Sequence, residues 1–148
     1  MIIASVEKVD LPDLKEIVSI CIPLMDEVPD EEKPHVQKLI LENIEVNLEL
    51  EKNSYLKAVA NNRTIGFILI KGHEKLSELF VLPEYRNRGI GSILLKAGIS
   101  DSIGKSHSNH IWVNAALNAV PFYKKHGFIN FTTNEKRFSF VERLEYRF

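Results

Sequence analysis

The 148-residue chain contains one cysteine, one tryptophan and seven glycines. A single cysteine, Cys21, excludes an intramolecular disulfide framework and a zinc site built from several thiolates. Because Ile20 and Ile22 flank it, we expect a buried, inert thiol rather than a nucleophile.

Long apolar runs and an excess charge are also missing. No stretch approaches the roughly 18 apolar residues of a membrane span, and residues 1–5 lack the features of a signal peptide. We therefore expect no membrane partner and a cytoplasmic location. The 19 basic and 20 acidic side chains give a net charge of −1, which argues against a nucleic-acid partner while leaving a local basic patch open.

What is present is the balance of one globular domain. Hydrophobic residues make up 45% and charged residues 26% of the chain, and its length is sufficient to bury a core. No repeat, low-complexity segment or linker interrupts it. We therefore treat residues 1–148 as a single domain.

Hydrophobic periodicity in the first half predicts two helices and then an antiparallel meander. Pro12 and Pro23 bracket the first helix, and Asn61-Asn62 is typical of a hairpin turn between two apolar runs. The expected strands cover 2–6, 55–60, 65–70 and 76–82, and the expected helices cover about 10–22 and 34–48.

The second half alternates between helices and strands. A glycine-rich turn at 89–91 opens a helix to about 103, and Gly127 is a suitable C-cap for a later one. At the end of the chain Phe138, Phe140, Leu144, Tyr146 and Phe148 share one parity, which predicts a strand with one buried face. The other expected elements are strands at 111–114 and 128–131 and a helix at 119–125. The fold class is α/β, with one mixed α+β sheet.

The turn Arg86-Asn87-Arg88-Gly89-Ile90-Gly91 carries the strongest chemical signal. A helix N-terminus offers unpaired N–H groups and partial positive charge to a pyrophosphate. Glycines at 89 and 91 let phosphate oxygens approach the backbone, while Arg86 and Arg88 add charge and Ser92 adds a hydroxyl donor. The expected donors are the backbone amides of residues 88, 89, 91 and 92.

Two other phosphate motifs fail on the same residues. A dinucleotide fingerprint requires glycine at position 94, which is Leu94. Gly104-Lys105-Ser106 resembles the end of a P-loop, but the first glycine of that motif would fall on Ile99, and the segment ends a helix.

Residues 81–92, VLPEYRNRGIGS, resemble the acetyl-CoA-binding motif of the GCN5-related N-acetyltransferase (GNAT) superfamily. Residues 119–128, AVPFYKKHGF, resemble the second signature of that family. The two occur in the family's order and on the expected elements. The resemblance implies a GNAT-like fold: a mostly antiparallel central sheet with a splayed pair of strands, flanked by about four helices.

The resemblance also implies acetyl-CoA as co-substrate, no metal, and direct acetyl transfer to an amine. The backbone of Phe80, Val81 and Leu82 would bind the pantetheine arm, and the Val81 N–H would polarise the thioester carbonyl. The expected cofactor-binding residues are Phe80, Val81, Leu82, Arg86, Asn87, Arg88, Gly89, Ile90, Gly91, Ser92, Asn114 and Tyr123.

Two residues are candidates for catalysis. Tyr123 matches a family tyrosine near the thioester sulfur and is a general-acid candidate, or else simply a core aromatic. Glu78 shares the parity of Leu76 and Phe80 on the strand leading to the turn, where some relatives carry a carboxylate base; burial would raise its pKa into a useful range. A solvated glutamate, a structural ion pair, or water as the base are the alternatives.

One position departs from the family pattern. Many relatives carry asparagine seven residues before the tyrosine, where this chain has Ala116. Asn114 is the nearest polar substitute for that cofactor contact, unless it only satisfies local backbone.

The sequence does not identify the acceptor. The acidic residues of segment 23–34 either attract a cationic amine or form ordinary solvated surface, and segment 132–137 is uninformative. The leading function is acetylation of a small amine, an amino acid derivative or a peptide N-terminus. A non-catalytic acyl-CoA-binding regulatory module and a toxin-like enzyme acting on aminoacyl-tRNA are the alternatives, and a homodimer stays open.

Overall fold

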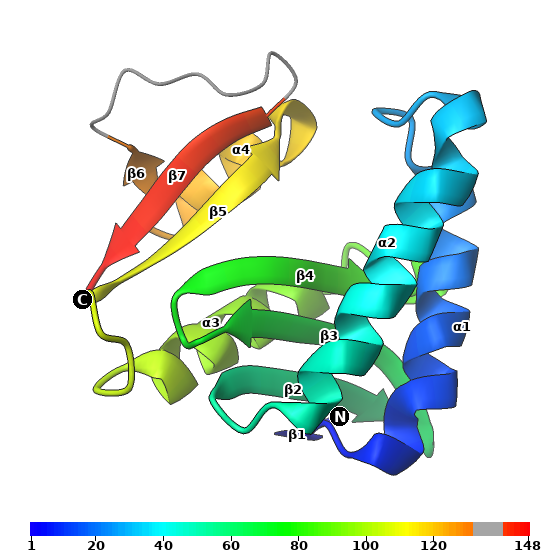
Figure 1. Cartoon of the computed structure of the whole chain (residues 1–148), viewed down its shortest axis with the longest axis horizontal. Coiled ribbons are helices and arrows are strands. Elements are labelled where there is room, and N and C mark those ends of the chain that lie inside the picture. Colours follow the sequence, from blue (N-terminus) through cyan, green and yellow to red (C-terminus); the bar gives the residue numbers. More distant parts are fainter. Residues whose placement is uncertain (132–140) are drawn as a thin grey trace.

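The computed structural model describes residues 1–131 and 141–148 and contains one seven-stranded sheet in the order β1-β2-β3-β4-β5-β7-β6 (Figure 1). The strands are β1 (Ile2–Ser5), β2 (Asn53–Ala60), β3 (Arg63–Lys71), β4 (Lys75–Val81), β5 (His110–Ala116), β6 (Ile129–Asn130) and β7 (Val141–Arg147). The α-helices are α1 (Leu11–Cys21), α2 (Lys33–Val46), α3 (Ile90–Ser102) and α4 (Val120–Lys125). Single 3-10 turns lie at Lys8–Asp10, Ile22–Leu24, Asp30–Glu32, Asn47–Glu49, Pro83–Tyr85 and Leu117–Ala119.

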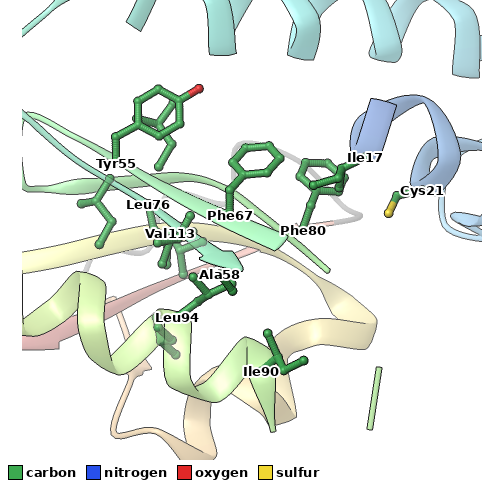
Figure 2. Close-up of a cluster of buried hydrophobic side chains, with 14 of the residues drawn as sticks. Ile17, Cys21, Tyr55, Ala58, Phe67, Leu76, Phe80, Ile90, Leu94 and Val113 are labelled. Carbon is green, nitrogen blue, oxygen red and sulfur yellow. The ribbon is translucent and has the colours of Figure 1, made fainter. Parts of the chain in front are cut away.

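Helices cover both faces of the sheet. Helices α1 and α2 lie on one face, and α3 and α4 lie on the other (Figure 1). Figure 2 shows Tyr55 and Phe67 on the α1–α2 side, with Leu94 and Ile90 of α3 on the opposite side. Strand β3 lies between the two layers, so Thr64 to Ile70 are buried without alternation. The mixed α/β fold with four α-helices confirms the predicted class.

Strands β4 and β5 form the only parallel pair among the described strands. Their sole paired position is Lys75 with Trp112, whereas the other neighbouring strands pair antiparallel over longer registers. Beyond Lys75 the two strands therefore diverge toward the end of β4. This is the splayed pair that the sequence resemblance implied.

Most predicted turns occur where expected. Asn61 and Asn62 adopt φ of 52° and 60°, the conformation of a two-residue primed hairpin turn. Gly127, with φ of 92°, follows α4, and Phe128 N–H donates to the Tyr123 carbonyl across it. The strand expected at 128–131 is shorter, at Ile129–Asn130.

A β-bulge changes the predicted faces of β4. Leu69 pairs with Glu78, but Ile70 pairs with Leu76, so Ser77 is the extra residue. Ile70 faces α3, because its Cδ1 atom lies 2.9 Å from the point that a Cβ on Gly98 would occupy. Leu76 therefore shares the α3 face, while Glu78 and Phe80 face α1 and α2. The prediction that Leu76 and Glu78 lie on the same face of the sheet is wrong, because the bulge shifts the alternation of faces by one residue.

The terminal strand is also less regular than its parity predicted. Leu144 is buried as expected, but so is Glu145 on the face predicted to be polar. β7 is flanked by β5 and β6, and the Arg147 guanidinium donates to the Glu145 carboxylate at 2.7 Å, which compensates its burial. Phe138 and Phe140 lie outside the described residues. Within the described part, every helix is too short or too polar to cross a lipid bilayer.

Candidate active site

A cleft of about 770 Å³ opens where β4 diverges from β5. It lies between the end of β4, the start of α3, helix α4 and the segment Leu24–Glu27. Its volume is that of an ordinary small-molecule site. Nine of the predicted cofactor-binding residues line it: Phe80, Val81, Arg86, Asn87, Gly89, Ile90, Gly91, Ser92 and Tyr123.

The start of α3 presents free backbone donors to this cleft. Gly89 caps the helix with φ of 79°, a conformation that favours glycine. The first intrahelical hydrogen bond runs from Ile93 N–H to the Gly89 carbonyl at 3.0 Å. The N–H groups of Ile90, Gly91 and Ser92 consequently have no partner within the helix. With the helix dipole, they form an anion-binding end.

The basic residues beside this turn take different positions. Arg86 lines the cleft and donates from Nε to the Val81 carbonyl at 3.3 Å. Arg88 is not among the lining residues; its guanidinium lies 5.3 Å from the Tyr85 ring. Lys125, in the last turn of α4, lines the cleft instead. Nothing in the sequence pattern distinguished Lys125 from Lys124, because only the packing of α4 determines which one faces the cleft.

The backbone of β4 alternates between two directions. Leu82 N–H donates to the Ile65 carbonyl at 2.8 Å, so Leu82 and Ile65 form a hydrogen-bonded antiparallel pair. The next pair, Val81 with Gly66, is then non-hydrogen-bonded, and Val81 N–H and C=O point away from β3. By the same alternation, the backbone N–H and C=O groups of Phe80 point toward β3. Those of Leu79 point toward the gap between β4 and β5.

This alternation corrects part of the predicted backbone site. The amides of Phe80 and Leu82 are directed at β3, so their N–H groups do not face the cleft. Leu79, which also lines the cleft, joins Val81 as an outward-facing donor that the sequence reasoning missed. The register of the β3–β4 pair was needed to find it.

Cys21 lies at the same edge of the sheet. It is 1% exposed, as expected, and its Sγ donates to the Val81 carbonyl at 3.5 Å. Burial raises the pKa of the thiol, against an opposing effect of Arg86. The cysteine therefore lines the cleft with little exposed surface and packs against the end of β4.

Glu78 lies on the α2 side of β4 and does not line the cleft. Asn43 of α2 donates from Nδ2 to Glu78 Oε1 at 3.0 Å. Burial raises the pKa of Glu78 to about 7, although Asn43, Lys71, Lys75 and Ser77 each lower it. A carboxyl with this pKa exchanges protons near neutral pH.

Tyr123 is both a core aromatic and a residue of the cleft. Its ring packs edge-on against Phe122 and Phe128 at centroid distances of 5.2 and 5.3 Å, and 7% of the residue is exposed. Burial, and secondly the negative charge of Glu78, raise the pKa of its hydroxyl. The phenol thus keeps its proton at neutral pH and is available as a donor.

Asn114 is exposed and does not line the cleft. Its Oδ1 accepts from Arg143 Nε at 3.0 Å, and the Arg143 guanidinium lies 4.4 Å from the Trp112 ring. This face of β5 and β7 is therefore cationic and aromatic.

The opposite rim of the cleft is acidic. Asp26 and Glu27 line it, and Asn118 Nδ2 donates to Glu27 at 3.4 Å. The remaining acidic residues of this segment, Asp30, Glu31 and Glu32, are exposed outside it.

Comparisons with known proteins identify the family. The model of the acetyltransferase (GNAT) domain family matches residues 25–147, so the chain belongs to the GNAT acetyltransferases. Among curated proteins, it is 39% identical over 80 residues to an uncharacterized N-acetyltransferase, YafP, of Escherichia coli, covering 54% of this chain and 49% of that protein. It is 39% identical over 57 residues to another, YjcF, of Bacillus subtilis, covering 38% and 40%. The matches thus span half or less of these two relatives.

Solved structures share the complete fold at low identity. A PaiA N-acetyltransferase of Thermoplasma acidophilum, in complex with coenzyme A, has a TM-score of 0.82 at 19% identity, covering 99% of this chain and 98% of that one. A GCN5-related N-acetyltransferase of Rhodopseudomonas palustris also has a TM-score of 0.82, at 18% identity, covering 99% and 95%.

Proposed function

We propose that this chain is an acetyl-CoA-dependent N-acetyltransferase that moves an acetyl group directly from coenzyme A to a primary amine. The acceptor is a small molecule, an amino acid derivative or a peptide N-terminus. The observation that carries the proposal is the convergence of two sets of backbone donors on one cleft: the free N–H groups at the start of α3 and the outward-facing groups of Leu79 and Val81.

Each set suits one part of acetyl-CoA. The amides of Gly89 to Ser92, with Arg86 and Lys125 beside them, would hold the pyrophosphate. The outward edge of β4 would bind the amide groups of the pantetheine arm as an added strand would. An N–H of Leu79 or Val81 would then stabilise the negative charge that develops on the thioester oxygen. Acetyl-CoA supplies the activated acetyl group.

The proton balance assigns roles to the two predicted catalytic residues. The amine attacks the thioester carbon in its neutral form and the carbon–sulfur bond breaks, so one proton leaves nitrogen and one is needed on sulfur. Glu78, with a pKa of about 7, accepts the proton of the amine, through water because it does not line the cleft. Tyr123, which lines the cleft with its proton retained, donates to the departing thiolate.

We also propose the charge of the acceptor and the compartment in which the protein acts. Asp26 and Glu27 on the cleft rim favour an amine acceptor that carries positive charge. The single, buried Cys21 is compatible with a reducing cytoplasm.

The experiment is a thiol-release assay with acetyl-CoA over amines, polyamines, amino acids and short peptides, together with thermal unfolding. We expect acetyl-CoA to raise the melting temperature, and at least one amine to accelerate release of the free thiol over the rate without acceptor. Stabilisation without release for any amine would favour the regulatory module instead. Absence of stabilisation would contradict the proposal as a whole.

A further inference from the structure

A chain of asparagine side chains leads from the β3–β4 turn to Glu78. Gly72 N–H donates to Asn53 Oδ1 at 2.9 Å. Asn53 Nδ2 donates to Asn47 Oδ1 at 3.3 Å, and Asn47 Nδ2 donates to Asn43 Oδ1 at 3.0 Å. Asn43 Nδ2 then donates to Glu78 Oε1 at 3.0 Å and to Ser77 Oγ at 2.7 Å.

The chain has one direction throughout. Each asparagine accepts on its oxygen and donates from its nitrogen to the next member. Since the first donor is a backbone N–H, which cannot accept, the amide of Asn53 is oriented with its oxygen toward Gly72. That orientation is passed to Asn47 and then to Asn43. The group presented to Glu78 is consequently an N–H donor and not an oxygen.

Two further contacts hold Asn43 and Asn47 in place. Asn47 is buried, and its Nδ2 also donates to the Asn43 carbonyl at 2.8 Å. The bulge at Ser77 directs Ser77 and Glu78 together toward α2. One amide nitrogen therefore reaches two consecutive side chains of β4, which regular strand alternation would separate.

The surroundings of Glu78 show why this donor matters. Burial disfavours the carboxylate, and Lys71 of β3 and Lys75 of β4 oppose that effect by their charge. Burial, and secondly the negative charge of Glu78, raise the pKa of two hydroxyls near it, those of Tyr55 on β2 and Tyr123 on α4. Asn43 is the neutral hydrogen-bond donor that α2 contributes, and donors to a carboxylate favour its ionised form.

We propose that Asn43 is a positioning residue for the reaction: it holds the Glu78 carboxylate ionised and in a fixed orientation, and so determines the pH range in which the amine is deprotonated. This inference rests on the proposed role of Glu78 as proton acceptor. It extends the functional unit to Asn47 and Asn53, which lie outside the cleft.

The test compares Asn43→Leu, which has a similar size, and Asn43→Ala with the wild type, using Glu42→Gln on the same helix as control. The readouts are the pH profile of kcat/KM and the Glu78 pKa from carbon-13 NMR titration, assigned with Glu78→Gln. Loss of one donor to a charged group should raise the Glu78 pKa and the acidic limb of the profile by about one unit. At pH 9, where Glu78 is ionised in every variant, kcat should fall only by the part that the orientation of the carboxylate contributes, and the KM for acetyl-CoA should stay near wild type.

The two assumptions fail in different ways. If the NMR pKa of Glu78 is unchanged in both Asn43 variants, the inference about Asn43 is overturned whatever the activity does. If that pKa rises but Glu78→Gln keeps the full pH profile, Asn43 controls Glu78 as inferred and the role of Glu78 as base is wrong. Asn43→Ala removes the donor without adding bulk or charge, and alanine favours a helix, so it keeps the test valid if Asn43→Leu does not fold.

Discussion

Glu78 illustrates how opposing local effects produce a useful acid–base group. Burial alone would keep its carboxyl protonated well above neutral pH. Two lysines and two hydrogen-bond donors act in the other direction, leaving a pKa of about 7. The value is therefore a balance, and each contributor is a separate target for mutation.

The raised pKa of Glu78 predicts how stability depends on pH. The unfolded chain releases this proton near its ordinary pKa of 4.5 and the folded chain near 7, so the unfolded state binds fewer protons between these values. The contribution of Glu78 to the free energy of unfolding must then fall as pH rises through that window, by roughly 3 kcal/mol.

Glu78→Gln removes the titrating group while its side-chain oxygen can still accept from Asn43. We expect the variant to be more stable than the wild type at pH 8 and to lose most of that advantage at pH 4.5. Urea unfolding at both pH values measures the difference, with Glu42→Gln as an exposed control. An advantage that is equal at both pH values would contradict the assigned pKa.

At the scale of elements, α3 uses its two N-terminal glycines for different reasons. Gly89 has φ of 79°, where a side chain is strained whatever space surrounds it. Gly91 has an ordinary helical backbone, and a Cβ there would meet only Phe122, at 3.8 Å. The fold thus requires Gly89, whereas Gly91 keeps the cleft side of the helix open.

These two glycines give a matched pair of variants. Gly89→Ala should destabilise the free protein by about 1–2 kcal/mol. Gly91→Ala should leave its stability within about 0.5 kcal/mol of wild type but weaken acetyl-CoA binding by about tenfold or more, because the added methyl group stands where phosphate oxygens approach the N–H groups. Chemical denaturation and calorimetric titration measure the two effects. Unchanged affinity in Gly91→Ala would place the phosphates elsewhere.

At the scale of the whole molecule, the cleft exists because the sheet is incomplete between β4 and β5. A parallel contact at one position joins two antiparallel units, β1 to β4 and β5 to β7. Figure 1 shows the second unit tilted away from the first. The N–H groups of Leu79 and Val81, which this divergence leaves without a partner strand, are those that a ligand would take over.

Hydrogen exchange tests this arrangement residue by residue. Without ligand, the amides of Leu79 and Val81 should exchange faster than those of Phe80 and Leu82, since only the latter two face β3. Saturating acetyl-CoA should slow Leu79 and Val81 and leave Phe80 and Leu82 nearly unchanged. Equal protection of all four amides in the free protein would rule out the alternation on which the backbone site rests.

Much of this architecture follows from local sequence. The asparagine pair at 61–62, the prolines that bracket α1, and the glycine turn before α3 act on a few neighbouring residues, so their effects were predictable. Two signatures in order were enough to indicate the family. The bulge at Ser77 was not predictable, since no residue type requires it; it arises from the pairing of β4 with β3. It reversed the expected face of Leu76 relative to Glu78.

By itself, the sequence determined the element order, the glycine turn that opens α3 and most of the residues that line the cleft, because each depends on chain-local geometry and charge. Only the tertiary structure decided which backbone groups of β4 face the cleft, that Lys125 and not Arg88 lines it, and that an asparagine chain from α2 reaches Glu78. These features depend on strand register and on the packing of segments more than 30 residues apart, where hydrogen-bond direction and burial are set by partners that no local pattern specifies.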